Sequence, residues 1–258
     1  MARRPNILYL MSDQHRADVT GYSGNAVVRT PTLDKLAETG IIFQNAYCPS
    51  PICVPARQSL MAGQLPRTCG CDVQGQDLQP GHMTFARRLA QYGYQTVLCG
   101  QNFHFGLDIM QGWTKLLGLA NAELTEGRVE EEYAKFAKPL NRNEVEHIQR
   151  AGIGRGYQVV RDEYTLQGAL DLINEYFNSP YDDRVNERPI LLKVVFAQPH
   201  YPFTAEENKF NYYMNRVEPF LAQHVSDHPM LGKKIWLGPV LTCRSGTFEG
   251  PPQPIMQW

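Results

Sequence analysis

The sequence predicts an α/β fold with a mixed, mostly parallel central sheet flanked by helices. Strand-like apolar runs alternate along the chain with amphipathic, helix-like segments, and this alternation is typical of parallel sheets with crossover helices. The run "PILLKVVFA" at residues 189–197 is apolar almost throughout, as expected of a strand buried on both faces. Polar residues follow the predicted strands directly, where the functional loops of such sheets lie.

The first quarter of the chain supplies two strands and two helices. A buried strand is predicted over residues 6–11. The pair Thr30-Pro31 opens a helix, because threonine is a favoured N-cap and proline fits the first turn. A second strand is predicted over residues 41–47. After a proline-rich loop, a short helix is predicted over residues 56–62.

The rest of the sheet comes from the middle and later parts of the chain. Thr84 is the expected N-cap of a helix that runs to residue 92, and a strand follows over residues 95–99. An irregular stretch separates this strand from an amphipathic helix predicted over residues 162–177. The side chains of that helix expected to face the core are Leu166, Leu170 and Ile173.

Composition narrows the range of partners. The 258 residues are 43% hydrophobic and 20% charged, with a formal net charge of -1. Nucleic acids and anionic membranes call for a basic excess, so neither is expected as a partner. No apolar run reaches the about 18 residues of a membrane span. The apolar run near the N-terminus is too short for a signal peptide, which predicts a cytoplasmic protein.

The six cysteines are expected to be free thiols, because disulfide frameworks belong mainly to secreted chains. A remote alternative is a thiol or zinc-binding protein, which would use Cys48, Cys53, Cys69 and Cys71. Only Cys53 has a context that suggests chemistry, since it lies where a helix begins and backbone N–H groups favour negative charge.

Candidate functional side chains lie in four loops that should meet at one edge of a doubly wound sheet. Asp13 follows the first strand and suits a hard divalent cation. Arg57 lies four residues after Cys53, and its planar fork suits a tetrahedral anion. His104 and His200 follow two later strands and could donate protons to a leaving oxygen.

The segment Cys53-Val-Pro-Ala-Arg57 resembles the Cys-x-Pro-x-Arg motif of the type I sulfatases and the related phosphonate monoester hydrolases. Residues 5–18 resemble the first strand and metal loop of that family, in the version with Asp13-Gln14 in place of two aspartates. Residues 30–40 resemble its first helix, and residues 199–203 resemble its late histidine loop. The resemblance covers roughly residues 4 to 230.

The resemblance implies an alkaline-phosphatase-like fold and hydrolysis of sulfate esters, as by arylsulfatases. In that family the cysteine is oxidised to formylglycine by a formylglycine-generating enzyme, which would be a protein partner. One hydroxyl of the aldehyde hydrate attacks sulfur or phosphorus, and the other then expels the bound product. The alternative substrates within the family are phosphonate and phosphate monoesters.

Site roles carried over from the family fall on matching positions. Cys53 would be the nucleophile, and Arg57 would hold the modified side chain. His200 would contact the transferring group or the leaving oxygen, and His104 would support it. The metal ligands implied are Asp13, Gln14 and Cys53, around Ca²⁺ or alternatively Mg²⁺ or Mn²⁺.

Two departures from the family pattern lead to a further expectation. The loop Gly100-Gln-Asn-Phe-His104 lacks the lysine of the family's Gly-Lys-x-His motif. The second pair of metal ligands is also missing, since Asp227-His228 does not follow a buried strand. We therefore expect residues 1–231 to be the N-terminal part of a sulfatase-like catalytic domain, truncated or frame-shifted before an irregular tail at residues 232–258.

Two other interpretations differ from an active hydrolase. One is a non-catalytic remnant of the same ancestry. The other is a phosphatase that uses an unmodified cysteine, but the sequence lacks the phosphate-cradling loop of such enzymes.

Overall fold

The computed structural model describes residues 4–104, 106–118, 151–178 and 188–217. The chain divides into two compact units, which we call unit 1 and unit 2 and describe separately. Unit 1 comprises residues 1–14, 41–124 and 158–198. Unit 2 comprises residues 15–40, 125–157 and 199–258.

Unit 1 contains a four-stranded parallel sheet with the strand order β1-β5-β2-β3. The strands are β1 (Ile7–Ser12), β2 (Gln95–Gly100), β3 (Lys115–Leu117) and β5 (Ile190–Phe196). All three described pairings are parallel, so the predicted α/β sheet is confirmed. The run predicted as a buried strand forms β5, which lies between β1 and β2 and is buried at six of its seven positions.

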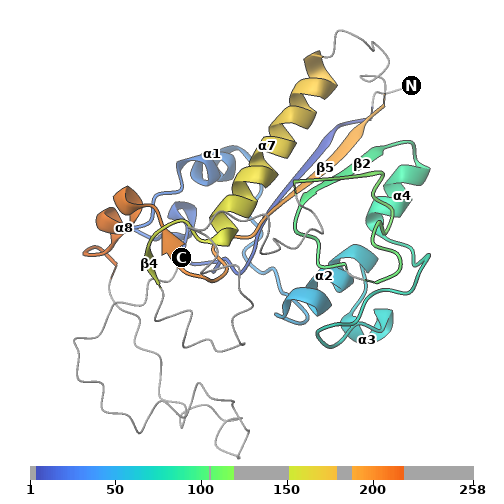
Figure 1. The fold of residues 1–258 in the computed structure, drawn as a ribbon, viewed down its shortest axis with the longest axis horizontal. Helices are drawn as coiled ribbons and strands as arrows, with labels where there is room; N and C mark the ends of the chain where they lie inside the picture. Colours follow the sequence, from blue (N-terminus) through green and yellow to red (C-terminus); the bar gives the residue numbers. More distant parts are fainter. Residues whose placement is uncertain (1–3, 105, 119–150, 179–187, 218–258) are drawn as a thin grey trace, which may run out of the picture. The chain divides into compact units, whose positions relative to one another are not determined.

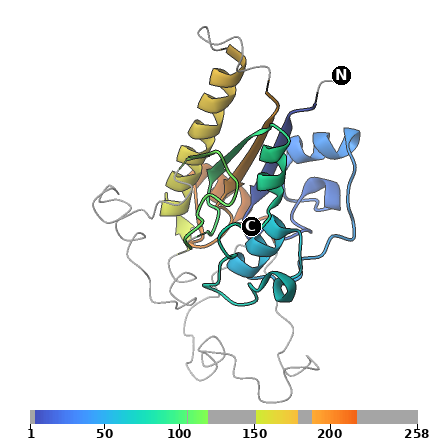
Figure 2. The same cartoon turned by 90° about the vertical axis from the view of Figure 1, so that its right-hand side faces the viewer.

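Helices cover both faces of this sheet (Figures 1 and 2). The long helix α7 (Tyr157–Asn178) lies along one face. On the other face lie α2 (Cys53–Ala62) and α4 (Phe85–Gln91), with the one-turn helix α3 (Pro66–Cys69) packed on α2. Residues alternate between the two faces along each strand, so each face has its own hydrophobic cluster.

The predicted core face of α7 is wrong. Leu166, Leu170 and Ile173 are exposed, with 37–50% of their surface accessible. The side of the helix that packs against the sheet is a different one. It carries the buried residues Thr165, Ala169, Leu172 and Tyr176. A Cβ on Gly168 would lie 3.2 Å from Cys99 Sγ, so small side chains on this face allow the helix to approach the strands closely.

The predicted strand over residues 41–47 is also wrong, because these residues have no strand conformation and pair with none of the described strands. Ile41, Phe43 and Tyr47 are each about four-fifths exposed. A short apolar run becomes a strand only when a neighbouring strand takes up its backbone hydrogen bonds. The helix capped by Thr84 is confirmed, since the threonine hydroxyl accepts a hydrogen bond from Arg87 N–H at 3.0 Å.

The described residues of unit 2 form short elements. They are the 3₁₀ turn η1 (Gly21–Ser23), α1 (Pro31–Thr39), β4 (Gly152–Ile153), β6 (Thr204–Ala205) and α8 (Glu207–Tyr213). β4 and β6 pair in parallel. Thr30 precedes α1 as predicted, but its hydroxyl donates to the carboxylate of Asp34 at 2.9 Å and makes no cap bond to the backbone.

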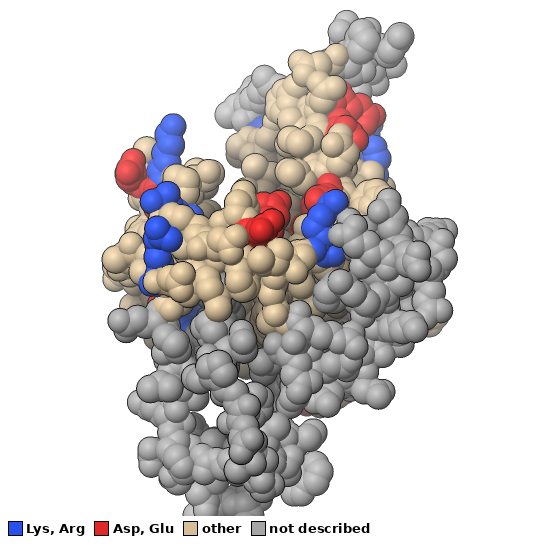
Figure 3. All heavy atoms as spheres, turned by 60° about the vertical axis from the view of Figure 1, so that its left-hand side comes forward, with Lys and Arg blue, Asp and Glu red and all other residues tan. Residues whose placement is uncertain are grey.

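Charged residues on the described surface are mixed in sign. Figure 3 shows basic and acidic side chains interspersed on the face drawn, and neither gathers into one continuous patch. Among the described residues, no helix is long and apolar enough to cross a membrane. The predicted tail at residues 232–258 and the pair Asp227-His228 lie outside the described residues, so these predictions stay predictions.

Candidate active site

The carboxyl ends of β1 and β2 bring two of the predicted loops to the same edge of the unit 1 sheet. Asp13 directly follows β1, and its N–H continues the ladder by donating to Phe196 O on β5 at 3.1 Å. The loop that contains His104 follows β2 after Gly100. Because the strands are parallel, both loops leave the sheet on one side.

Cys53 is the first residue of α2, three residues earlier than the helix was predicted to begin. The preceding Ile52 is extended, with φ -128° and ψ 140°, and Pro55 lies in the first turn, where its missing N–H costs no hydrogen bond. The N–H of Val54 donates to the side-chain oxygen of Gln74 at 3.3 Å. The helix start therefore holds Cys53 half-buried at a defined place.

Arg57 lies one turn further along α2 and is paired with Asp13. The guanidinium Nη2 is 3.3 Å from Asp13 Oδ2, and both side chains are more than nine-tenths buried. The guanidinium also contacts Met11 Sδ on β1 and lies 5.5 Å from the centroid of the Phe103 ring. This pair joins the start of α2 to the end of β1, as the sequence motifs predicted for one common site.

The thiol of Cys53 is a weak nucleophile in its unmodified form. Burial raises the pKa of the Cys53 thiol above its ordinary value, and the carboxylate of Asp13 raises it further. Arg57 and a backbone hydrogen bond oppose the rise without cancelling it. The thiolate that a cysteine nucleophile needs is therefore scarce at neutral pH.

His104 is 1% exposed and electrically neutral at pH 7. Burial lowers the pKa of His104 to about 3, and the positive charges of Lys193 and Arg57 act in the same direction. The ring nitrogen Nδ1 is 2.8 Å from Nε2 of Gln58, a residue of α2 that is itself fully buried. This contact is one of those that link the loop after β2 to α2.

The two remaining predicted residues are Gln14, the last residue of the first segment of unit 1, and His200, which belongs to unit 2. Gln14 is exposed and adopts a positive φ of 55° next to Asp13. His200 belongs to unit 2, where its Nδ1 is 2.8 Å from the carbonyl oxygen of Tyr201. Unit 1 therefore brings together Asp13, Cys53, Arg57 and His104, while His200 belongs to the second unit.

Sequence reasoning missed two buried polar residues of this region. Lys193 lies in the middle of β5 and is 2% exposed, and its ammonium lies 5.3 Å from the centroid of the Tyr9 ring. Burial lowers the pKa of Lys193 to about 7, and the charge of Arg57 adds to this. A lysine within the apolar run "PILLKVVFA" was the available signal. Gln58 offered no such signal, because a lone glutamine in a helix is ordinarily exposed.

The described residues offer the type of ligand atom that a divalent metal ion needs, but too few of them. Asp13 and Gln14 offer the oxygen atoms that Ca²⁺ and Mg²⁺ prefer, and a modified residue 53 would offer another. These ions take about six or more ligands, so further donors are needed. Within the described part of the chain, no three His, Cys, Asp or Glu residues form a metal-binding group.

The other described cysteines show no sign of a zinc or redox site. Cys48 is exposed, whereas Cys69, Cys71 and Cys99 are buried free thiols. Burial raises the pKa of both Cys71 and Cys99 to about 12, so both thiols stay protonated. Among the described residues, these thiols belong to no group of three or more potential metal ligands.

The buried Asp13–Arg57 pair and Cys53 lie in an α/β core, at the carboxyl end of its parallel sheet. The sulfatase family profile matches residues 5–228 of this chain, and the chain belongs to the sulfatase family. The choline-sulfatase of Rhizobium meliloti (strain 1021) is 30% identical over 215 residues, which are 81% of this chain and 41% of that protein. The arylsulfatase of Clostridium perfringens (strain 13 / Type A) is 26% identical over 230 residues, 84% of this chain and 47% of that protein.

Solved structures confirm the fold. The phosphonate monoester hydrolase of Agrobacterium radiobacter superposes with a TM-score of 0.64 at 20% identity, over 91% of this chain and 50% of that one. A glucosamine-disulfate complex of the protein BT4656 superposes with a TM-score of 0.59 at 19% identity, over 85% of this chain and 40% of that one. The alkaline-phosphatase-like fold is therefore established for the described core. The chain spans about half the length of these relatives or less.

Proposed function

We propose that this chain carries the nucleophile side of a formylglycine-dependent hydrolase of sulfate esters. The observation that carries the proposal is the position of Cys53 at the start of α2, beside the buried Asp13–Arg57 pair. The raised pKa of its thiol supports a nucleophile made by modification rather than by ionisation. Conversion to formylglycine would supply a hydrated aldehyde whose hydroxyl attacks the ester.

The residues of unit 1 take distinct roles in this proposal. Asp13, Gln14 and residue 53 hold a divalent cation, Ca²⁺ or alternatively Mg²⁺ or Mn²⁺, which would supply Lewis-acid stabilisation of negative charge. Arg57 is held by Asp13 and Met11 and offers its remaining donors to an anionic oxygen. Since Arg57 is buried, its charge acts in a water-poor site, where it counts for more than at the surface.

His104 serves this site as a neutral hydrogen-bond donor. The sequence suggested that it gives up a proton, but with a pKa of about 3 its ring holds no extra proton to transfer at pH 7. A neutral imidazole still donates one N–H to developing negative charge. His200 remains the candidate for proton donation to the leaving oxygen, a role that rests on its motif.

Phosphonate and phosphate monoesters are the alternative substrates, because Arg57 and a divalent cation would suit their tetrahedral anions equally well. A formylglycine-generating enzyme is the partner required in either case. A non-catalytic remnant of the family is the competing interpretation, and the cytoplasmic location predicted from the sequence remains part of the proposal.

The test is to express the chain together with a formylglycine-generating enzyme and to measure conversion of residue 53 by peptide mass spectrometry. Hydrolysis of 4-nitrophenyl sulfate and of a phosphonate monoester with a phenyl leaving group is then assayed with added Ca²⁺ or Mn²⁺. We expect conversion and metal-dependent hydrolysis that Cys53→Ala abolishes. The matched control is Cys48→Ala, an exposed cysteine five residues away, which should leave both unchanged. Conversion without hydrolysis of either ester would favour the remnant.

A further inference from the structure

The side chain of Gln58 is surrounded by groups that fix which end of its amide is oxygen. The backbone N–H of Leu78 donates to Gln58 Oε1 at 3.3 Å, and only an oxygen can accept it. At the other end, the carbonyl oxygen of Phe103 lies 3.2 Å from Nε2, and the carboxylate of Asp77 also contacts Nε2. Both are acceptors, so the end that faces them carries the hydrogens.

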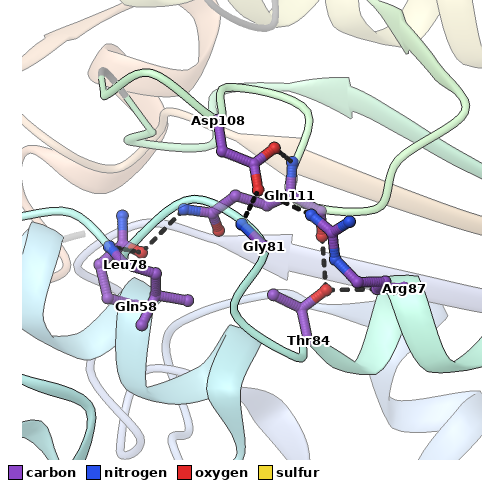
Figure 4. Close-up of polar contacts among 7 residues, drawn as sticks. All are labelled: Gln58, Leu78, Gly81, Thr84, Arg87, Asp108 and Gln111. Carbon is purple, nitrogen blue, oxygen red and sulfur yellow. Dashed lines mark hydrogen bonds and ion pairs between the residues drawn. The ribbon is translucent and has the colours of Figure 1, made fainter.

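A second layer of side chains holds this orientation in place (Figure 4). Gln111 Nε2 donates to Gln58 Oε1 at 3.1 Å. The backbone N–H of Gln111 donates to Asp108 at 3.1 Å, and Asp108 is also paired with Arg87 at 2.6 Å. The hydroxyl of Thr84 donates to the Gln111 carbonyl oxygen. Rotation of the Gln58 amide would break contacts at both of its ends.

The orientation of Gln58 decides the protonation of His104. An amide NH₂ group can only donate, so the imidazole nitrogen 2.8 Å away must accept. If Nδ1 carried a proton, two donors would face each other in a site where both residues are buried and water cannot intervene. This excludes the Nδ1–H tautomer and also the imidazolium, which has protons on both nitrogens.

We propose that Gln58 is a positioning residue that holds His104 as the neutral Nε2–H tautomer, with its single N–H on the ring nitrogen that does not face Gln58. The inference rests on the proposed function for its use in catalysis, whereas the tautomer itself follows from the contacts of unit 1. It also places a third functional residue on α2 beside Cys53 and Arg57, one position after the Cys-x-Pro-x-Arg motif.

Charged groups around His104 agree with this arrangement. Arg57 from α2 and Lys193 from β5 both disfavour a positive ring, and Asp108 from the loop after β2 is the opposing charge. Asp77 contacts the Gln58 amide and so competes for its hydrogens. The two hydrogens of Nε2 face three acceptors, so at least one hydrogen is shared between two of them.

The test is two-bond ¹H–¹⁵N correlation spectroscopy of the full chain labelled with ¹⁵N-histidine, which separates the two neutral tautomers from the cation. His104→Asn assigns the signal. In the wild-type chain we expect only the Nε2–H form of His104 from about pH 5 to pH 8. In Gln58→Met, which keeps length but removes the donor, we expect both tautomers. In Gln58→Glu we expect the proton to move to Nδ1 and the pKa of the ring to rise.

The matched control is Gln76→Glu, an equal change in the neighbouring loop. Gln76 Oε1 accepts from the N–H groups of Asp72 and Val73 at 2.7 and 3.0 Å, which a carboxylate does equally well. The Gln76→Glu variant should therefore leave the His104 signal unchanged. A wild-type spectrum with the proton on Nδ1, or a His104 cation at pH 7, overturns the inference even if no Gln58 variant folds.

Activity then separates the inference from the proposed function. If the modified chain hydrolyses 4-nitrophenyl sulfate, Gln58→Met should lower kcat on the order of tenfold with little change in KM, less than the 10²–10³ commonly lost when a donor is deleted outright. An unchanged kcat would overturn the catalytic use of the tautomer. If the wild-type chain is inactive, the proposed function fails while the spectrum still decides the role of Gln58.

Discussion

The two faces of the unit 1 sheet are supplied by the same strands but are packed in different ways. The face under α7 is apolar and close-packed, with Val97, Cys99, Leu192 and Val194 against small and aliphatic side chains of the helix. The face under α2 and α4 buries two cations, Arg57 and Lys193, among Met, Leu and aromatic residues.

This difference separates stability from function within one sheet. Burying charge costs free energy unless a partner offsets it, so a core selected for stability alone would contain none. Arg57 has a partner in Asp13, whereas the Lys193 ammonium lies over the rings of Tyr9 and Phe85. The face under α2 is also the one that carries Cys53. We infer that the loss of stability caused by burying Arg57 and Lys193 on this face is tolerated because the site needs buried positive charge.

The change with the largest expected effect is Arg57→Met. It would leave the carboxylate of Asp13 buried without a counter-charge, which commonly costs about 3–5 kcal/mol of unfolding free energy. Arg16→Met is the control, because Arg16 and Asp18 form an exposed pair and such pairs contribute about 0–1 kcal/mol. Denaturant unfolding would measure the unfolding free energy of both variants. Equal losses would show that the buried pair contributes no more to stability than the exposed pair.

Two separate variants, Leu172→Ala and Leu170→Ala, would test which face of α7 packs against the core. Leu172 is 4% exposed and Leu170 is 50% exposed. Truncating Leu172 should cost about 2–5 kcal/mol, as expected for a buried leucine. Truncating Leu170 should cost less than about 1 kcal/mol. The reverse order would restore the face predicted from the sequence.

Lys193→Met should stabilise the protein at pH 7, by about 1–4 kcal/mol. The pKa of Lys193 is lowered to about 7 on folding, below the ordinary lysine value near 10.5. Between these values the unfolded chain binds the proton more tightly, so the wild-type gains stability as pH rises from about 7 to 10.5.

The advantage of Lys193→Met should therefore shrink across that pH range. Thermal unfolding of the two proteins at several pH values would measure this. A constant difference between them would show that folding does not lower the pKa of Lys193, and a destabilised variant would show that its charge is favourably paired.

The sequence by itself determined the parallel α/β core, its principal strands and helices, and the membership of Asp13, Cys53 and Arg57 in one site. These features follow from local signals. Apolar runs set β1, β2 and β5, threonine capped α4, and polar residues followed the strand ends. Parallel strands bring their carboxyl ends to one edge, so sequence order was enough to predict that Asp13 and Arg57 meet.

Only the tertiary structure decided which apolar surfaces are buried and what protonation the polar residues adopt. The buried side of α7 uses Thr165, Gly168 and Ala169 because close approach to the strands matters more there than hydrophobicity. The segment at residues 41–47 is apolar, but within the described part of the chain no strand lies beside it. The tautomer of His104 depends on Gln58, whose orientation is set by Leu78 in one loop and by Phe103 and Gln111 in another. Such properties come from contacts between residues distant in sequence, which no local pattern records.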